Sequence, residues 1–340
     1  MKNKKWISLA AAVILAVTAL PMTAFAAEKD GGEEKLTKVT LNEVAHSIFY
    51  APQYVAIEEG YFAEEGLDLT LVTGFGADKT MTAVISGEAE IGFMGAEASV
   101  YAYQEGATDP VVNFAQLTQR AGNFLVAREE MPDFKWEDLK GKKVLGGRKG
   151  GMPEMVFEYI LKKNGIDPQK DLTIDQSIDF GSTAAAFTGD DSAAYTVEFE
   201  PSATILEKEG AGYVVASLGE ASGYVPYTSY SAKASYMKEN PEIIQKFTDA
   251  LQKGMDYVQS HTPEEIAEVI APQFKETDLE TITAIVKRYY DQDTWKENLI
   301  FEKDSFELLQ DILEDAGELN TRAKYEELVQ TEYARKACES

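Results

Sequence analysis

Short loops that follow predicted strands hold the residues best suited to contact a small molecule. The first such loop, residues 46 to 52, places Phe49 and Tyr50 directly before a predicted helix. Either ring can stack on a ligand face, or it can pack into the core as most aromatic side chains do. His46, in the same loop, is weak evidence for a site by itself. The loop predicts an aromatic contact and leaves open whether ligand or core receives each ring.

Two further loops combine glycine with a carboxylate. Residues 74 to 79, GFGADK, contain Gly76, which lets a ligand approach the main chain, but they lack the Gly-Lys-Ser/Thr ending of a phosphate-binding loop. Gly95 precedes Glu97, whose carboxylate lies at a predicted helix N-terminus. There it is stabilised by the helix dipole, or it accepts hydrogen bonds from a ligand. These loops predict ligand contacts without nucleotide binding.

The most glycine-rich loop of the chain is residues 146 to 155, GGRKGGMPEM. It contains Gly150, Gly151 and Met152, and Pro153 marks a helix start. A purely structural turn does not need four glycines, whereas backbone N–H groups in such a loop can donate to an anionic or carbonyl group. The loop is predicted to grip a ligand.

Two carboxylates stand at the end of a predicted strand, in Glu198-Phe199-Glu200-Pro201. Alternate strand residues point to opposite faces, so Glu198 and Glu200 are predicted to share one side, with at least one facing a ligand. The full set of predicted ligand contacts is Phe49, Tyr50, Gly76, Gly95, Glu97, Arg120, Asn123, Gly150, Gly151, Met152, Tyr195, Glu198 and Glu200.

Residues for catalysis or metal binding are scarce. The chain has one cysteine, Cys338, and two histidines, His46 and His261. It lacks a nucleophile elbow, a histidine close in sequence to a serine or cysteine nucleophile, and a metal-ligand cluster. The sequence therefore predicts a binding protein rather than an enzyme, with no catalytic residue, no metal and no cofactor.

The composition limits the partners of the protein. Its 340 residues carry a formal net charge of −26. Such a surface repels nucleic acid and anionic lipid, because phosphate binding draws its free energy from basic residues. Nucleic-acid functions are excluded on this ground, and the length favours two domains or lobes.

The first 26 residues predict a secretory signal peptide. They combine a basic start, an apolar run that ends at Leu20, and small residues before Ala27. A membrane anchor is the alternative reading of the same run. Residues 27 to 38 are polar and predicted to be a flexible leader. The protein is therefore expected outside the cytoplasm, in a periplasm or at the cell surface.

The candidate loops separate short β-like runs from helical segments, which predicts an α/β fold with parallel strands. The alternation occurs in two series, so we expect two lobes: residues 39–125 as the first part of lobe 1, 126–226 as lobe 2, and 227–340 as the return to lobe 1. Extended runs at 123–129 and 227–233 are predicted to cross between them. The candidate loops then meet in an interlobe cleft.

The chain after Ser235 is predicted to be almost wholly helical, with starts near Pro241, Pro263, Asp278, Asp304 and Asn320. Acidic helices of this kind are typical of solvated faces packed on lobe 1. A separate helical domain that binds a partner is the alternative.

Four segments resemble a known family: EEGYFAEEGLDLTLV (58–72), TAVISGEAEIGFMG (82–95), WEDLKGKKVLGG (136–147) and FEP (199–201). In order and spacing they resemble the substrate-binding proteins of ABC transporters for nitrate, sulfonate, taurine and thiamine-pyrimidine precursors. The resemblance implies a periplasmic-binding-protein type II fold, a ligand held between the lobes, and delivery to a membrane permease driven by a cytoplasmic ATPase. We expect the protein to act as a monomer.

The resemblance also implies ligand contacts at Phe49 and Tyr50, at the Gly95 turn, at residues 150–153 and at Glu200. One departure is that no cysteine follows the signal peptide, so the lipid anchor common among Gram-positive binding proteins is not available.

Within this family the ligand choice lies between anions and flat heterocycles. Glu97, Glu198 and Glu200 oppose a sulfonate or nitrate, whereas aromatic side chains suit a planar ring. We therefore expect a pyrimidine or thiamine-precursor-like ligand, or another flat nitrogen heterocycle. An anion held by Arg120 and Arg148 is the alternative. A pyrimidine synthase of the same fold is disfavoured because its cysteine-rich motif is absent. A sensor that presents its ligand-bound state to a membrane receptor has the same sequence features as a transport receptor and is a further alternative.

Overall fold

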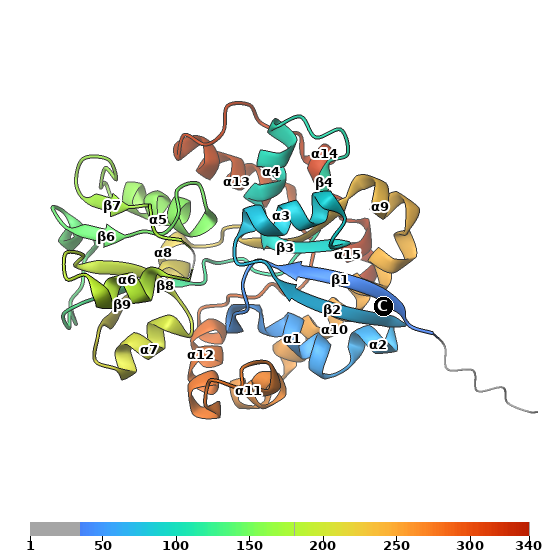
Figure 1. The fold of residues 1–340 in the computed structure, drawn as a ribbon, viewed down its shortest axis with the longest axis horizontal. Coiled ribbons are helices and arrows are strands. Elements are labelled where there is room, and N and C mark those ends of the chain that lie inside the picture. Colours follow the sequence, from blue (N-terminus) through green and yellow to red (C-terminus); the bar gives the residue numbers. More distant parts are fainter. Residues whose placement is uncertain (1–34, 180, 340) are drawn as a thin grey trace, which may run out of the picture. The chain divides into compact units, whose positions relative to one another are not determined.

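The computed structural model describes residues 35–179 and 181–339, and its strands form two mixed sheets (Figure 1). The first has five strands in the order β2-β1-β3-β10-β4, and the second has five in the order β7-β6-β8-β5-β9. We call the part built on the first sheet lobe 1 and the part built on the second lobe 2. The predicted signal peptide and most of the predicted leader lie outside the described residues, and the last two leader residues belong to β1.

The strands of lobe 1 are β1 (Thr37–Glu43), β2 (Leu67–Thr73), β3 (Ile91–Gly95), β4 (Val111–Gln116) and β10 (Thr228–Lys233). The strands of lobe 2 are β5 (Asn123–Ala127), β6 (Lys143–Leu145), β7 (Thr173–Asp175), β8 (Tyr195–Phe199) and β9 (Tyr213–Ser217).

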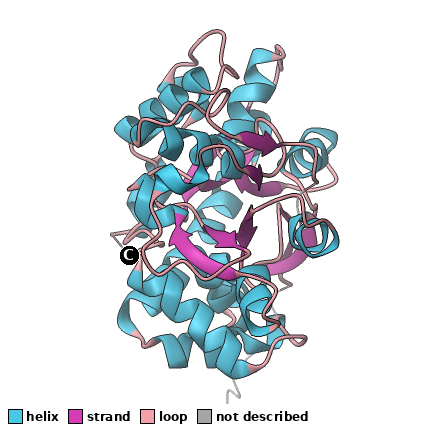
Figure 2. Cartoon of the chain, turned by 90° about the vertical axis from the view of Figure 1, so that its left-hand side faces the viewer, coloured by secondary structure: helices cyan, strands magenta, loops and turns pink. Residues whose placement is uncertain are grey.

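Helices surround the strands of both sheets (Figure 2). In the first half of the chain they are η1 (Ile48–Tyr50), α1 (Ala51–Glu58), α2 (Tyr61–Glu64), α3 (Ala77–Ser86), α4 (Glu97–Gln104), η2 (Trp136–Leu139) and α5 (Met152–Lys163). They continue with α6 (Thr183–Gly189), α7 (Ser202–Lys208), α8 (Leu218–Ser222), α9 (Ala234–Glu239), α10 (Pro241–Ser260), α11 (Pro263–Ile270) and η3 (Ala271–Gln273). The last are α12 (Leu279–Asp291), α13 (Lys303–Asp315), α14 (Tyr325–Leu328) and α15 (Glu332–Ala337).

Parallel pairing, which the alternating sequence pattern predicts, holds for β1 with β2 and β3, and for β6 with β7 and β8. Strands β5 and β10 are the exceptions, because both run antiparallel to their neighbours. A parallel neighbour needs a long crossover, usually a helix. The chain enters β5 and β10 directly from the other lobe, without such a helix, and therefore pairs in the opposite direction.

The predicted positions of the two crossing segments are wrong. Residues 123–129 contain the whole of β5 and residues 227–233 the whole of β10. The chain passes between the lobes in residues 117–122 and 223–227 instead. All five residues of β5 are buried. A buried extended segment must satisfy its backbone N–H and C=O groups, and pairing within a sheet does this.

The C-terminal helices pack mainly on lobe 1. Helix α10 buries Ile244, Phe247, Leu251, Met255 and Val258, an apolar stripe with helical spacing, and it contacts α1, α2 and α15. Helices α14 and α15 contact β4. Helix α13 differs, because it also packs on α5 of lobe 2. No helix in the described part of the chain combines the length and apolar character needed to span a membrane.

Candidate ligand-binding site

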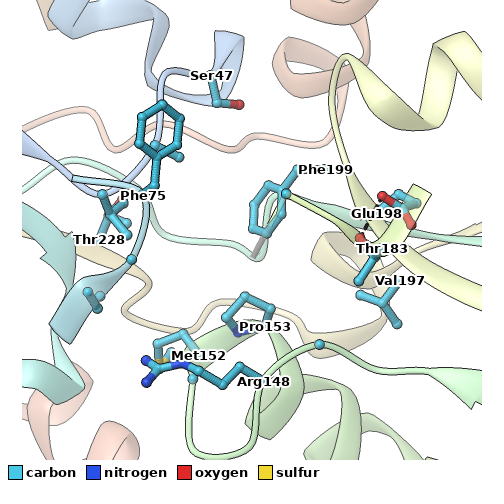
Figure 3. A pocket seen from close by; sticks show the side chains of 18 of the residues that line it. Ser47, Phe75, Arg148, Met152, Pro153, Thr183, Val197, Glu198, Phe199 and Thr228 are labelled. Carbon is cyan, nitrogen blue, oxygen red and sulfur yellow. Dashed lines mark hydrogen bonds between the residues drawn. The ribbon is translucent and has the colours of Figure 1, made fainter. Parts of the chain in front are cut away.

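A cavity of about 240 Å³ lies between the lobes where their strands end (Figure 3). Lobe 1 contributes the loops after β1, β2 and β3, and lobe 2 contributes the loops after β6 and β8 and the start of α6. Open α/β sheets bind ligands at the carboxyl ends of their parallel strands. The cavity occupies this position in both lobes at once.

Most of the predicted ligand contacts line this cavity. They are Tyr50, Gly76, Gly95, Glu97, Gly151, Met152, Glu198 and Glu200. Each lies at or just after a strand end or at a helix start, so loops far apart in the sequence meet here. Their contact with a ligand stays a prediction.

Three predicted residues lie away from the cavity lining. Phe49 is fully buried in the core, where a Cβ on Gly122 would lie 2.5 Å from its ring. Asn123 accepts a hydrogen bond from the hydroxyl group of Tyr227 at 3.1 Å. Tyr195 stands at the first position of β8, at the opposite end of the strand from the cavity. Each of these side chains has a structural partner or a core position instead.

Arg120 and Gly150 also lie outside the lining. The guanidinium group of Arg120 stacks on Tyr224, 4.3 Å from the ring centre, and donates a hydrogen bond to the carbonyl of Gly219 at 3.1 Å. Gly150 borders a neighbouring groove. Arg120 is therefore not positioned as the anion-binding residue that the sulfonate or nitrate alternative requires.

Phe75 is the clearest cavity residue that the sequence pattern did not indicate. Its ring lies on the lobe 1 side of the pocket, with Phe199 from lobe 2 across from it (Figure 3). Phe75 is 65% exposed and has a φ of +56°, a left-handed conformation that bulky residues rarely adopt. An aromatic residue between Gly74 and Gly76 was the available signal, since a turn at the surface offers it no core.

Glu97, the first residue of α4, is only 3% exposed. Its carboxylate accepts a hydrogen bond from the backbone N–H of Met152, across the cleft, while its Oε2 has no partner among the described residues. Gly95 provides the space, because a Cβ there would lie 2.1 Å from Oε2. Burial raises the pKa of Glu97 to about 7, against the lowering effect of the backbone hydrogen bonds and of Arg148.

Glu198 lies on the lobe 2 wall and is 2% exposed. The hydroxyl groups of Thr183 and Thr196 donate hydrogen bonds to its carboxylate at 2.9 and 2.6 Å. Burial raises the pKa of Glu198 to about 7, and these two neutral donors offset burial only in part. A carboxylate offers about four lone-pair sites, so Glu198 can accept further hydrogen bonds from a ligand.

The carboxylate of Glu200 is held by contacts within the protein. Its carboxylate accepts hydrogen bonds from the backbone N–H and hydroxyl of Thr204, both at 3.0 Å, and pairs with Arg288 of α12 at 2.6 Å. Burial still raises the pKa of this carboxyl, although Arg288 and Thr204 lower it. Strand β8 ends at Phe199, and Glu198 and Glu200 both line the cavity, as the shared side predicts.

Direct contacts between the lobes surround the cavity. The Tyr101 hydroxyl donates a hydrogen bond to the carbonyl of Gly150 at 2.9 Å, and the Ser47 hydroxyl donates to the carbonyl of Glu200 at 3.1 Å. Together with the bond between Glu97 and Met152, these contacts hold the two walls of the cavity against each other. The geometry is that of a closed cleft.

His46 lines the cavity, but other groups occupy both ring nitrogens. Nδ1 lies 2.8 Å from Glu43, and Nε2 donates to the carbonyl of Gln273 at 2.9 Å. Burial acts to lower the pKa of His46, but the hydrogen bonds to Glu43 and Gln273 outweigh it and raise the pKa above its usual value. The ring therefore serves to fix the loop after β1.

The arrangement can bind and orient a small molecule. It presents aromatic and small apolar side chains together with buried carboxyl groups and backbone of the glycine-rich loop. Among the described residues, histidine, cysteine, aspartate and glutamate side chains form no group that could hold a metal ion. The cavity supplies recognition groups rather than a nucleophile paired with a base.

The family described as NMT1/THI5 like matches residues 48–266 of this chain. A relative from Bacillus subtilis (strain 168), YtlA, is named for a binding role and is 46% identical over 332 residues, covering 98% of each chain. The riboflavin-binding protein RibY of Chloroflexus aurantiacus is 25% identical over 236 residues, which cover 68% of this chain and 65% of RibY.

The fold agrees with a solved structure, that of the periplasmic nitrate-binding protein NrtA from Synechocystis PCC 6803. It superimposes with a TM-score of 0.71 at 15% identity, covering 90% of this chain and 89% of NrtA. At this identity the similarity concerns the fold alone, which is that of type II periplasmic binding proteins. The family match over residues 48–266 and the similarity to YtlA, which is named for a binding role, show that the chain belongs to the NMT1/THI5-like family.

Proposed function

We propose that this protein captures a flat nitrogen heterocycle, such as a pyrimidine or a thiamine precursor, in the interlobe cavity and delivers it to an ABC permease. The observation that carries the proposal is the pair of buried carboxyl groups, Glu97 on lobe 1 and Glu198 on lobe 2, which both line the cavity with acceptor capacity left over. N–H groups of a heterocycle are the donors that such carboxyl groups lack.

The same carboxyl groups disfavour an anionic ligand. The N-terminus of α5 is the natural place for an anion, because its backbone N–H groups point outward. Glu97 already accepts the hydrogen bond of Met152 there. A sulfonate or nitrate in this cavity would have to displace Glu97 or lie beside it. An unpaired buried charge costs several kcal/mol, which is comparable to the whole binding free energy of a small ligand.

The aromatic wall supports a planar ligand. Tyr50, Phe75 and Phe199 line the cavity from both lobes. Aromatic side chains bind flat rings through their faces and edges. A related protein, RibY, is named for binding riboflavin, which contains a flat nitrogen heterocycle. This name supports the ligand class and does not identify the ligand.

Export and transport complete the proposal. Residues 1–26 would direct the chain out of the cytoplasm, to a periplasm or the cell surface, and the relative NrtA is described as periplasmic. The partners would be the ligand, a membrane permease and its ATPase, with the binding protein acting as a monomer and without enzymatic activity.

The decisive experiment is native mass spectrometry of the exported protein, followed by a melting-temperature screen with pyrimidines, thiamine relatives, flavins, nitrate and sulfonates. We expect a heterocycle to co-purify and to raise the melting temperature. Glu198→Gln should weaken its binding about tenfold or more, since hydrogen bonds to a charged group contribute about 1.5–3 kcal/mol. Glu239→Gln, on the exposed surface, is the control. A rise with nitrate or a sulfonate and none with heterocycles would replace this proposal with the anion alternative.

A further inference from the structure

A groove of about 830 Å³ adjoins the cavity. It follows α3 and α4, and the residues 148–150 of the glycine-rich loop border it. Ala77, Glu97 and Arg148 line both the groove and the cavity. The two hollows are therefore neighbours with a shared boundary, and Arg148 marks that edge of the pocket in Figure 3.

One face of helix α4 lines the groove. Glu97, Tyr101 and Gln104 lie at positions i, i+4 and i+7, so they share one side of the helix, and the small residues Ala98 and Ala102 keep the surface beside them low. Glu97 Oε2 and Gln104 Nε2 are both buried atoms without a hydrogen-bond partner among the described residues. The seven-residue separation places them about 10 Å apart along the helix axis.

The positions of these two atoms indicate which part of a ligand could lie in the groove. Unpartnered buried polar atoms are rare in folded proteins, because each costs free energy unless a partner binds it. Here an acceptor lies at the inner end of the groove and an amide donor at the outer end. A hydroxyl group can both donate and accept. A chain that carries several hydroxyl groups could satisfy both atoms along one side of α4.

The boundary between the hollows can open at low cost. Arg148 lies 3.6 Å from Asp78, and these side chains are 46% and 60% exposed. Ion pairs that are this exposed contribute only about 0–1 kcal/mol. Gly147 and Gly150, with φ of +88° and +73°, lie on either side of the segment that carries Arg148. An arginine held this weakly can move aside for a substituent.

The charges around the groove select against an anionic substituent. Arg148 and Lys149 are balanced by Asp78, Glu105 and Glu318, all of which line the groove, and Lys149 pairs with Glu318 at 3.2 Å. The basic groups are thus already opposed by carboxylates. A phosphate would meet these carboxylates, whereas a neutral chain would not.

We infer that the groove is a second subsite, which binds a neutral hydroxyl-bearing chain attached to the ring in the cavity. The inference rests on the proposed function and narrows its ligand class to flat heterocycles that carry such a chain. The ring occupies the space between the lobes, and the chain passes Arg148 and lies along α4 between Glu97 and Gln104.

Three flavins with one ring system test the inference, with affinities measured by flavin fluorescence and calorimetry on refolded, ligand-free protein. Lumichrome has no chain, riboflavin has a neutral polyhydroxyl chain, and flavin mononucleotide adds a phosphate. We expect riboflavin to bind at least tenfold more tightly than lumichrome, and flavin mononucleotide to bind more weakly than riboflavin.

Ala102→Phe should fill the groove and reduce riboflavin affinity to that of lumichrome, while lumichrome affinity stays within twofold. Ala63→Phe, an exposed position on α2, is the matched control. Equal affinities of lumichrome and riboflavin in the unaltered protein, or equal losses for both in Ala102→Phe, would overturn the groove subsite and leave the ring site standing. Binding of none of the three flavins would overturn the subsite in this form. A heterocycle site would then have to be judged on the co-purified ligand alone.

Discussion

The buried carboxyl groups of the cavity make the stability of the protein depend on pH. Glu97 and Glu198 both have a pKa raised to about 7 by burial, well above the value of 4.5 for an exposed glutamate. In the unfolded chain they ionise near pH 4.5, so rising pH stabilises the unfolded state first. Each group therefore lowers the free energy of unfolding between about pH 4.5 and 7, and the loss is complete above pH 7.

Glu97→Gln isolates this effect, because its amide oxygen can still accept the hydrogen bond from Met152. The pKa difference corresponds to about 3 kcal/mol at about 1.4 kcal/mol per unit. Urea unfolding at pH 4.5, 5.5, 7 and 8 should show the unaltered protein losing up to about 3 kcal/mol more than the variant across this range. Exposed Glu239→Gln should follow the unaltered protein. Parallel curves for Glu97→Gln would mean that Glu97 is ionised without cost.

The residues of the site divide into those that a sequence can indicate and those that it cannot. Glu97 and Met152 could be predicted, because strand ends and helix starts are visible locally. The role of Glu200 could not, since its direction depends on Arg288, 88 residues away. Phe49 likewise turns into the core because Gly122, on the segment between the lobes, leaves space for its ring.

At the scale of elements, α12 joins the two lobes. Arg288 of α12 pairs with Glu200 at the end of β8 and with Glu207 of α7, at 2.6 and 3.1 Å. Tyr289 of the same helix donates a hydrogen bond to the carbonyl of Gly122, in the segment that connects the lobes, at 2.7 Å. The helical region after Ser235 therefore contacts lobe 2 and the segment that connects the lobes, and it also covers lobe 1.

A double-mutant cycle measures this connection. Glu200→Ala leaves a cation without its buried partner and should cost about 3 kcal/mol of unfolding free energy. Arg288→Ala should also destabilise, but the double variant should lose clearly less than the sum of the two, by urea denaturation. Lys287→Ala removes the neighbouring exposed pair with Asp291 and should change stability by less than about 0.5 kcal/mol. Additive losses would show that Glu200 and Arg288 are not coupled.

The elements themselves were largely predictable, whereas the antiparallel pairing of β5 and β10 was not. Helical and strand periodicity identified the alternating segments and the helical C-terminal region. The segments 123–129 and 227–233 were correctly expected to be extended but were misplaced as connections. Both pair with strands far away in the sequence, and a local pattern does not contain the partner of a strand.

At the scale of the whole molecule, the position of β10 determines the order in which the lobes can be completed. All strands of lobe 2 come from one continuous stretch, residues 123–217, whereas β10 lies between β3 and the edge strand β4 of the lobe 1 sheet. Contacts between distant residues slow folding, since a long loop must close first. Lobe 2 can therefore form its sheet before β10, the last strand of lobe 1 along the chain, is in place.

Pulsed hydrogen exchange during refolding should accordingly show amides of β5 and β8 protected before those of β3 and β10, and simultaneous or reversed protection would contradict this order. Until β10 is in place, the edges of β3 and β4 are unpaired and can pair with a wrong strand, including one from a second chain. A chain that is synthesised from its N-terminus passes through this interval each time it is made, because β10 is the last strand of lobe 1 to appear. The strand that closes lobe 1 thus sets the period in which the protein is most exposed to aggregation and most in need of chaperones.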